Sequence, residues 1–218
     1  MSLRRHIACA ALLVCASPAG AHPHVWADMR SAVVFTAGGL VRGVKVEWTF
    51  DEAYSNVAVD GLDSNGDGVY SPAELAPLTE VNLAALKTYG YFIFMRLDGN
   101  VRKIGDPEEA GQIYAHGKLT LHFTMPLVEP IDPRKGQFML KVYDPEFFID
   151  FEYTRKKPAS VIGAMPAQCR LVIKPVPTDA ELNQTRLMLS TKGTDWKPDN
   201  GENFGGMFAQ PVMIACGP

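Results

Sequence analysis

The stretch from Asp63 to Glu74 constrains the fold of this chain most, because its spacing matches one well-defined loop. A calcium-binding EF-hand loop takes side-chain oxygens from positions 1, 3, 5, 9 and 12, a main-chain carbonyl from position 7 and a glycine at position 6. The residues at these positions are, in that order, Asp63, Asn65, Asp67, Ser71, Glu74, Val69 and Gly68. The stretch therefore predicts a Ca²⁺ site.

The segments on either side of this loop have the apolar spacing of helices. Phe50, Tyr54, Val57 and Ala58 precede it, and after it come Leu75, Leu78, Val81, Ala85, Leu86 and Tyr89. Pro72 suits the first turn of the second helix. We expect a helix-loop-helix insert at about 51–89. Because the chain holds no second copy of the loop, Ca²⁺ is expected to brace the fold, with a dissociation constant on the order of 0.1–1 mM.

The N-terminus has the pattern of a secretory signal peptide. Arg4 and Arg5 precede an apolar run from Ile7 to Ala16, and Ala19-Gly20-Ala21 forms a small-residue cleavage site. A lipoprotein signal at Cys15 is disfavoured by the bulky Val14 before it. We expect residues 1–21 to be removed and residues 22–218 to form a single periplasmic domain with no transmembrane segment.

Charge and cysteine content indicate which kinds of protein this chain can be. A net charge of −3 gives no indication of nucleic-acid binding. Cys9 and Cys15 leave with the leader, and Cys169 and Cys216 remain in an oxidising compartment, where they predict a disulfide that ties the tail to the core. A cysteine metal or redox pair is the alternative, disfavoured because there is no Cys-x-x-Cys motif.

Alternation of apolar and polar residues predicts strands over most of the remaining chain. Val25 to Phe35 and Leu40 to Phe50 form a hairpin around Ala37-Gly38-Gly39, and Asp98-Gly99 suits a type I′ turn. Further strands are expected at Tyr91–Leu97, Lys118–Thr124, Gln137–Tyr143, Phe147–Tyr153 and Arg170–Lys174. Thr178–Leu189 suits a short helix and Lys192–Gly206 a loop. The fold class is mainly β (α+β), a β-sandwich-like domain with the helical insert.

Signal cleavage would expose His22-Pro23-His24 as the new N-terminus. Alternate residues of a strand share a face, so His22, His24 and Asp28 can point the same way, and His122 could complete a site with His24. Imidazole suits Zn²⁺, Ni²⁺, Cu²⁺ and iron. The alternative is that the histidines at the terminus are solvated and bind nothing. His116 is expected to lie exposed in a turn.

The acidic pairs have simple structural interpretations. Asp51 and Glu52 suit the N-terminus of the first helix, and Asp144-Pro145-Glu146 suits a turn between strands. No nucleophile elbow, phosphate-binding glycine loop or His-Glu-x-x-His motif occurs. We therefore do not expect an enzyme.

Five stretches together resemble the family of bacterial exported proteins catalogued as domain of unknown function 1007. They are His22–Trp26, Trp48–Glu52, Asp63–Glu74, Leu119–Phe123 and Tyr143-Asp144-Pro145. The resemblance implies a periplasmic component of an uncharacterised transport system, associated with inner-membrane permeases for zinc, nickel or cobalt. It also favours His22 and His24 as metal ligands.

The leading hypothesis is a periplasmic metal-binding accessory protein for a transition-metal transporter, with structural Ca²⁺ and Zn²⁺ or Ni²⁺ at the histidines. A second hypothesis is a copper enzyme that uses His22 together with His116 or His122. A third is a calcium-braced interaction module whose termini bind nothing.

Overall fold

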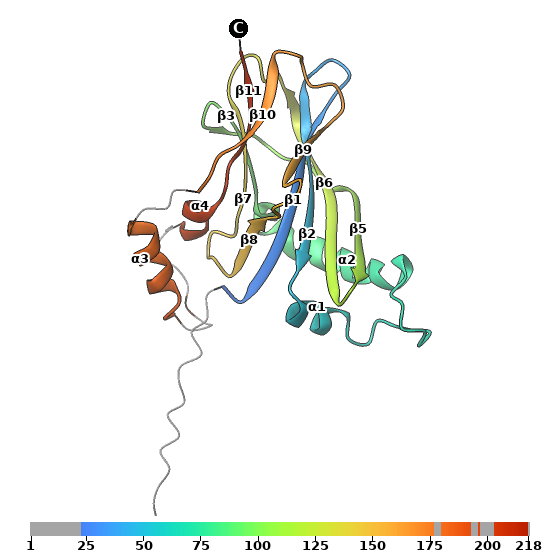
Figure 1. The fold of residues 1–218 in the computed structure, drawn as a ribbon. Coiled ribbons are helices and arrows are strands. Elements are labelled where there is room, and N and C mark those ends of the chain that lie inside the picture. Colours follow the sequence, from blue (N-terminus) through green and yellow to red (C-terminus); the bar gives the residue numbers. More distant parts are fainter. Residues whose placement is uncertain (1–22, 177–179, 193–195, 197–202, 218) are drawn as a thin grey trace, which may run out of the picture.

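The computed structural model describes residues 23–176, 180–192, 196 and 203–217 (Figure 1). Residues 1–21, predicted as a signal peptide, and His22 therefore lie outside the described residues. The mainly β class predicted from the sequence is confirmed, with two sheets and few helices. The strands are β1 Val25–Phe35, β2 Val41–Phe50, β3 Ile93–Leu97, β4 Asn100–Val101, β5 Glu108–Ala115, β6 Lys118–Ile131, β7 Phe138–Val142, β8 Ile149–Tyr153, β9 Ala159–Ile162, β10 Cys169–Ile173 and β11 Val212–Cys216. The helices are α1 Glu52–Val59, α2 Pro72–Lys87, the short 3-10 turn η1 Gly90–Phe92, α3 Ala180–Leu189 and α4 Phe204–Phe208.

The first sheet has the strand order β5-β6-β2-β1-β8, and β9 also pairs with β1. The predicted β1–β2 hairpin is confirmed, with Met29 opposite Trp48 and Gly39 in the left-handed conformation that its turn requires. Both β8 and β9 run parallel to β1, one after the other along the same edge. The second sheet has the order β10-β11-β7-β3-β4. Its β3–β4 turn holds Asp98 and Gly99 at positive φ, as type I′ geometry demands.

The inner faces of both sheets share one hydrophobic core. Because strand side chains alternate between faces, the predicted inward residues of β1, β2 and β6 are buried while Asp28 and Arg30 on the other face are exposed. Most of the largest fully buried side chains come from the two sheets: Met29, Trp48, Leu119, Leu121, Phe123 and Met125 from the first, and Met95, Phe138, Leu140 and Ile214 from the second. Two helical residues, Leu75 of α2 and Leu189 of α3, are buried to the same extent.

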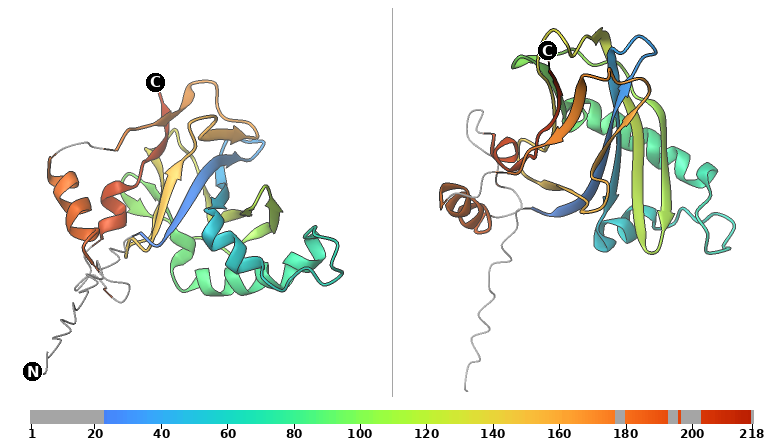
Figure 2. Two further views of the ribbon diagram at one scale, coloured as in Figure 1. Left: turned by 60° about the horizontal axis from the view of Figure 1, so that its bottom comes forward. Right: turned by 45° about the horizontal axis from the view of Figure 1, so that its top comes forward.

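The helical insert lies between β2 and β3, as predicted, and packs along one side of the sandwich (Figures 1 and 2). Asp51 caps α1 by accepting the Tyr54 N–H, which confirms its predicted role. The buried Ser55 hydroxyl accepts the Leu119 N–H of β6, and the Thr79 hydroxyl of α2 donates to Gln112 of β5. These hydrogen bonds fix both helices to the first sheet.

Four residues assigned to the apolar helical stripes are exposed instead, and Ala85 and Tyr89 are two of them. Val57 is 79% exposed and Val81 is 65% exposed. The helices contact the sheet along a narrow face that buries Val59 and Leu75, so the predicted stripe was too wide. Among the described residues no helix is long and apolar enough to cross a membrane.

The chain contains more regular structure than the sequence predicted. Strands β4, β5, β9 and β11 were not predicted, and α4 begins within the C-terminal segment assigned as a loop.

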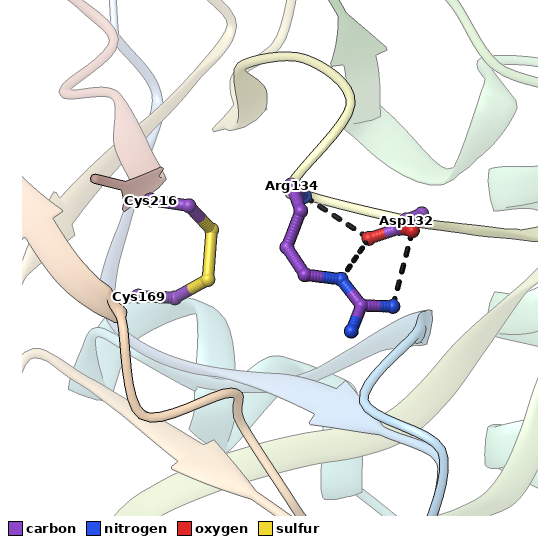
Figure 3. The surroundings of a disulfide bond; sticks show 4 residues. All are labelled: Asp132, Arg134, Cys169 and Cys216. Carbon is purple, nitrogen blue, oxygen red and sulfur yellow. Dashed lines mark hydrogen bonds and ion pairs between the residues drawn. A yellow bond between two sulfur atoms is a disulfide. The ribbon is translucent and has the colours of Figure 1, made fainter. Parts of the chain in front are cut away.

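The predicted disulfide is confirmed: Cys169 of β10 and Cys216 of β11 are directly paired in the second sheet and covalently joined (Figure 3). Near it, Arg134 forms a two-pronged hydrogen-bonded pair with Asp132.

Candidate functional site

The loop between α1 and α2 is organised around the carboxylate of Asp63. Its Oδ1 accepts the main-chain N–H groups of Gly66 at 2.8 Å and Asp67 at 3.2 Å, and its Oδ2 accepts that of Gly68 at 2.9 Å. Gly66 and Gly68 have φ values of 72° and 76°. The chain can coil this tightly because glycine adopts positive φ without steric cost.

The next two acidic or amide side chains of the loop also turn back onto its main chain. Asn65 Oδ1 accepts the Asp67 N–H at 2.9 Å, and Asp67 Oδ1 accepts the Val69 N–H at 2.7 Å. Together with Asp63 they line the inside of one coil with oxygen atoms. Oxygen donors are the ligands that Ca²⁺ takes in proteins.

Glu74 closes the loop from the first turn of α2. Its Oε1 accepts from the main-chain and hydroxyl groups of Ser64, and its Oε2 accepts from the same two groups of Ser71. These hydrogen bonds, led by the Ser71 main chain, lower the pKa of Glu74 to about 2, so the carboxylate is ionised at neutral pH. Ser71 in turn caps α2, and Pro72 occupies the predicted first helical position.

The donor set of the loop fits Ca²⁺ chemically, although the carboxylates are hydrogen-bonded to the loop itself. Within the described ranges, no three His, Cys, Asp or Glu side chains are grouped so as to hold one ion, so Asp63, Asp67 and Glu74 are not brought together around one point. The other predicted ligands are Asn65, Ser71 and the Val69 carbonyl. Glu74 would have to exchange its serine contacts for the ion.

His24 is the first predicted transition-metal ligand that the structure describes. Its main-chain N–H donates to the Phe148 carbonyl at 2.9 Å, and its ring lies 4.7 Å from the Phe148 ring. This contact holds the start of the described chain against the turn that leads into β8. Asp28 follows on the exposed face of β1.

His122 does not join His24, so the expectation that the two share a site is wrong. Through the strand register, His122 lies beside Glu47 of β2, which lies beside Arg30 of β1. Arg30 is six residues beyond His24, which amounts to about 20 Å along the strand. The His122 ring instead covers Gly111, where a Cβ atom would lie 3.0 Å from Cε1. His116 lies exposed in the β5–β6 turn, as predicted.

Carboxylates that the sequence did not group together meet on the outer face near the start of β1. Asp28, Asp51, Asp150 and Glu152 border a recess of about 170 Å³ with Lys118. The parallel β1–β8 register produces this grouping, because it sets Asp28 beside Glu152. No local sequence signal marks Asp150 or Glu152, since they lie more than a hundred residues beyond Asp28.

Asp150 is the most perturbed carboxyl of this recess. Burial, and next the negative charge of Glu152, raise its pKa to about 6, and Arg186 of α3 opposes the shift. Burial disfavours the charged form of Asp150, whereas the neighbouring charge of Glu152 would attract a cation, and a cation close by would favour ionisation of Asp150.

A cavity of about 410 Å³ opens between the helical insert and the turn from β7 to β8. Its walls are mainly aromatic and aliphatic, and include Trp48 and Phe50 of β2, Tyr54 of α1, Leu86 of α2, Phe92 and Phe148. Trp48 is 1% exposed, and its indole N–H has no hydrogen-bond partner among the described residues. Such dimensions and lining are typical of small-molecule sites.

Asp144 forms the acidic part of this wall and confirms the predicted turn. Its carboxylate accepts the main-chain N–H groups of Glu146, Phe148 and Ile149. Burial raises the pKa of Asp144, and these three hydrogen bonds oppose the shift. The turn is thus held by one buried carboxyl group.

Comparison with known proteins gives one family match. The family described as "Protein of unknown function (DUF1007)" matches residues 7–216 of the chain. The chain belongs to this family. It is also similar to an uncharacterised 15.5 kDa protein encoded in the trpE 3′ region of Spirochaeta aurantia, with 29% identity over 99 residues that cover 45% of this chain and 70% of that protein.

Four of the five stretches that carry the DUF1007 resemblance supply residues that line the cavity. Val25, Trp48 with Phe50, Leu121 and Asp144 come from four of those stretches, and all line it. The fifth, the loop from 63 to 74, joins the two helices that supply Tyr54 and Leu86. Residues that are far apart in the sequence therefore line the same cavity.

Proposed function

We propose that this member of the DUF1007 family is an exported metal-binding accessory protein, with Ca²⁺ held by the loop from 63 to 74. The observation that carries the calcium assignment is the coil that the Asp63 carboxylate organises through three main-chain N–H groups. The ligands would be Asp63, Asn65, Asp67, Ser71, Glu74 and the Val69 carbonyl. The bound ion would supply positive charge that draws the two helix ends together.

The expected consequence of Ca²⁺ is greater stability, since an ion that binds only the folded state stabilises it. At free Ca²⁺ twenty times the dissociation constant, the gain is about 2 kcal/mol. Calorimetric titration and thermal unfolding of the chain that begins at His22 measure both quantities. Glu74→Gln should weaken binding at least about tenfold, because it removes a two-oxygen anionic ligand.

Glu80→Gln is the matched control, because Glu80 lies exposed on the same helix and outside the loop. It should bind Ca²⁺ like the wild type. Absence of binding by the wild type, or equal loss in both variants, would remove the calcium proposal.

The accessory role in transition-metal transport is proposed for the same exported protein, with a permease of the inner membrane as its partner. His22, His24 and Asp28 would hold Zn²⁺ or Ni²⁺. What supports this is the recess beside the start of β1, where four carboxylates border one surface. The disulfide fits an oxidising compartment such as the periplasm. The role is binding, without catalysis.

Titration of Zn²⁺ and Ni²⁺ into the chain beginning at His22 tests the histidine ligands. A His22→Ala, His24→Ala double variant should bind at least about tenfold more weakly, since imidazole is a principal ligand for both ions. His116→Ala, in an exposed turn, serves as the control and should change nothing. Equal affinity of the wild type and the double variant would contradict the proposal.

A further inference from the structure

We propose that the cavity beside the helical insert binds an organic cation with an apolar body, such as a quaternary ammonium compound. The proposal is independent of Ca²⁺ and of the N-terminal histidines. It rests on the aromatic walls of the cavity and on the charge of the groups that line it.

The walls present several aromatic rings to one space of about 410 Å³. Phe50 and Tyr54 lie with ring centroids 4.7 Å apart where β2 passes into α1, and Phe92 and Phe148 belong to the opposite side, near β7 and β8. Aromatic faces carry negative electrostatic potential and attract cations within about 6 Å of the ring centre. An uncharged apolar ligand would gain burial here but not this attraction.

The charged groups of the lining point to the same sign of ligand. Asp144 and Glu146 are among the described lining residues, and none of these is Lys or Arg. Three main-chain N–H groups hold the Asp144 carboxyl in the wall, so it cannot swing away into solvent. An anion in this space would meet two carboxylates at low dielectric, which is unfavourable.

The apolar walls also select against small inorganic ions. A hydrated divalent ion needs several oxygen or nitrogen ligands to replace its water, and this cavity offers mostly carbon. A quaternary ammonium group has no N–H groups to satisfy and is attracted by ring faces. The volume admits a ligand of fragment size.

Trp196 also borders the cavity, but Lys192 already lies 5.2 Å from the centre of its ring. Lys192 is not itself a lining residue. We therefore expect the ligand cation to lie nearer Phe50, Tyr54 and Phe92.

The test is calorimetric or NMR titration of the folded mature chain with benzyltrimethylammonium. Choline and its uncharged isostere 3,3-dimethylbutan-1-ol then isolate the effect of charge. We expect both cations to bind and the alcohol to bind at least about fivefold more weakly than choline, as a cation–π contact and a carboxylate together allow. Absence of cation binding, or equal binding of choline and the alcohol, would overturn the proposal.

Two pairs of variants locate the site. Glu146→Gln should weaken cation binding at least about threefold, whereas Glu80→Gln, exposed on α2 and outside the cavity lining, should not. Ala85→Trp, which places a large side chain at the cavity lining, should abolish binding, whereas Ala84→Trp, at an exposed alanine on the opposite face of α2, should not. Thermal unfolding confirms that each variant is folded. Cation binding that is unchanged in Glu146→Gln or retained in Ala85→Trp would contradict the assignment.

Discussion

Breaking the Cys169–Cys216 disulfide is expected to lower the free energy of unfolding by about 4 kcal/mol. The bond links residues 47 apart in sequence, so its loss frees a long segment of the unfolded chain. In the folded state it joins paired positions of β10 and β11, at one edge of the second sheet. For a domain of this size the melting temperature should fall by about 10 °C.

Thermal unfolding of the Cys169→Ser, Cys216→Ser double variant measures this effect. Dithiothreitol should destabilise the wild type to a similar extent and leave the double variant unchanged. If oxidised and reduced wild type unfold at the same temperature, the bond does not constrain the unfolded chain as described.

Replacement of Trp48 by alanine is expected to cost about 3–5 kcal/mol of stability. The indole is 1% exposed and packs edge-on against Phe123 at 5.2 Å and against Phe151 at 4.8 Å. Removing it would leave a void that joins the neighbouring cavity. Denaturation in urea gives the free-energy change directly.

Trp48→Phe is expected to be far milder, within about 1.5 kcal/mol of the wild type. Phenylalanine keeps most of the ring and removes the indole N–H, whose unpaired burial costs about 1–3 kcal/mol. Trp26→Ala is the control, because Trp26 is 52% exposed on the outer face. A cost for Trp48→Phe as large as that for Trp48→Ala would contradict this expectation.

The sequence predicted the helix-loop-helix insert well because each of its helices begins with a local signal. Asp51 suits the start of α1 and Pro72 fits the first turn of α2, whereas the capping role of Ser71 was found only in the structure. Asp51 and Pro72 act on neighbours a few residues away, so their spacing in the chain is enough to assign them. The same holds for the Asp98-Gly99 turn. Strand β5 was not predicted because its apolar and polar residues do not alternate cleanly and because it contains Gly111. Only one of its side chains, Gln112, is buried.

The candidate site was predictable only in part. The position of the loop between the two helices could be predicted from residue spacing, since all its residues are close together in the chain. The recess of Asp28, Asp150 and Glu152 could not be read in this way, because it depends on the parallel pairing of β8 with β1. The separation of His24 from His122 likewise depends on register across two strands.

The sequence by itself determined the alternating strands, the β1–β2 hairpin, the helical insert and the cysteine pair, because periodicity, turn chemistry and cysteine number act locally or by elimination. Only the tertiary structure decided which strands are neighbours, that β8 and β9 share one edge of β1, and that Trp48, Tyr54 and Phe148 enclose a cavity. Such contacts join residues far apart in the chain. They depend on the packing of two whole sheets, which no short stretch of sequence specifies.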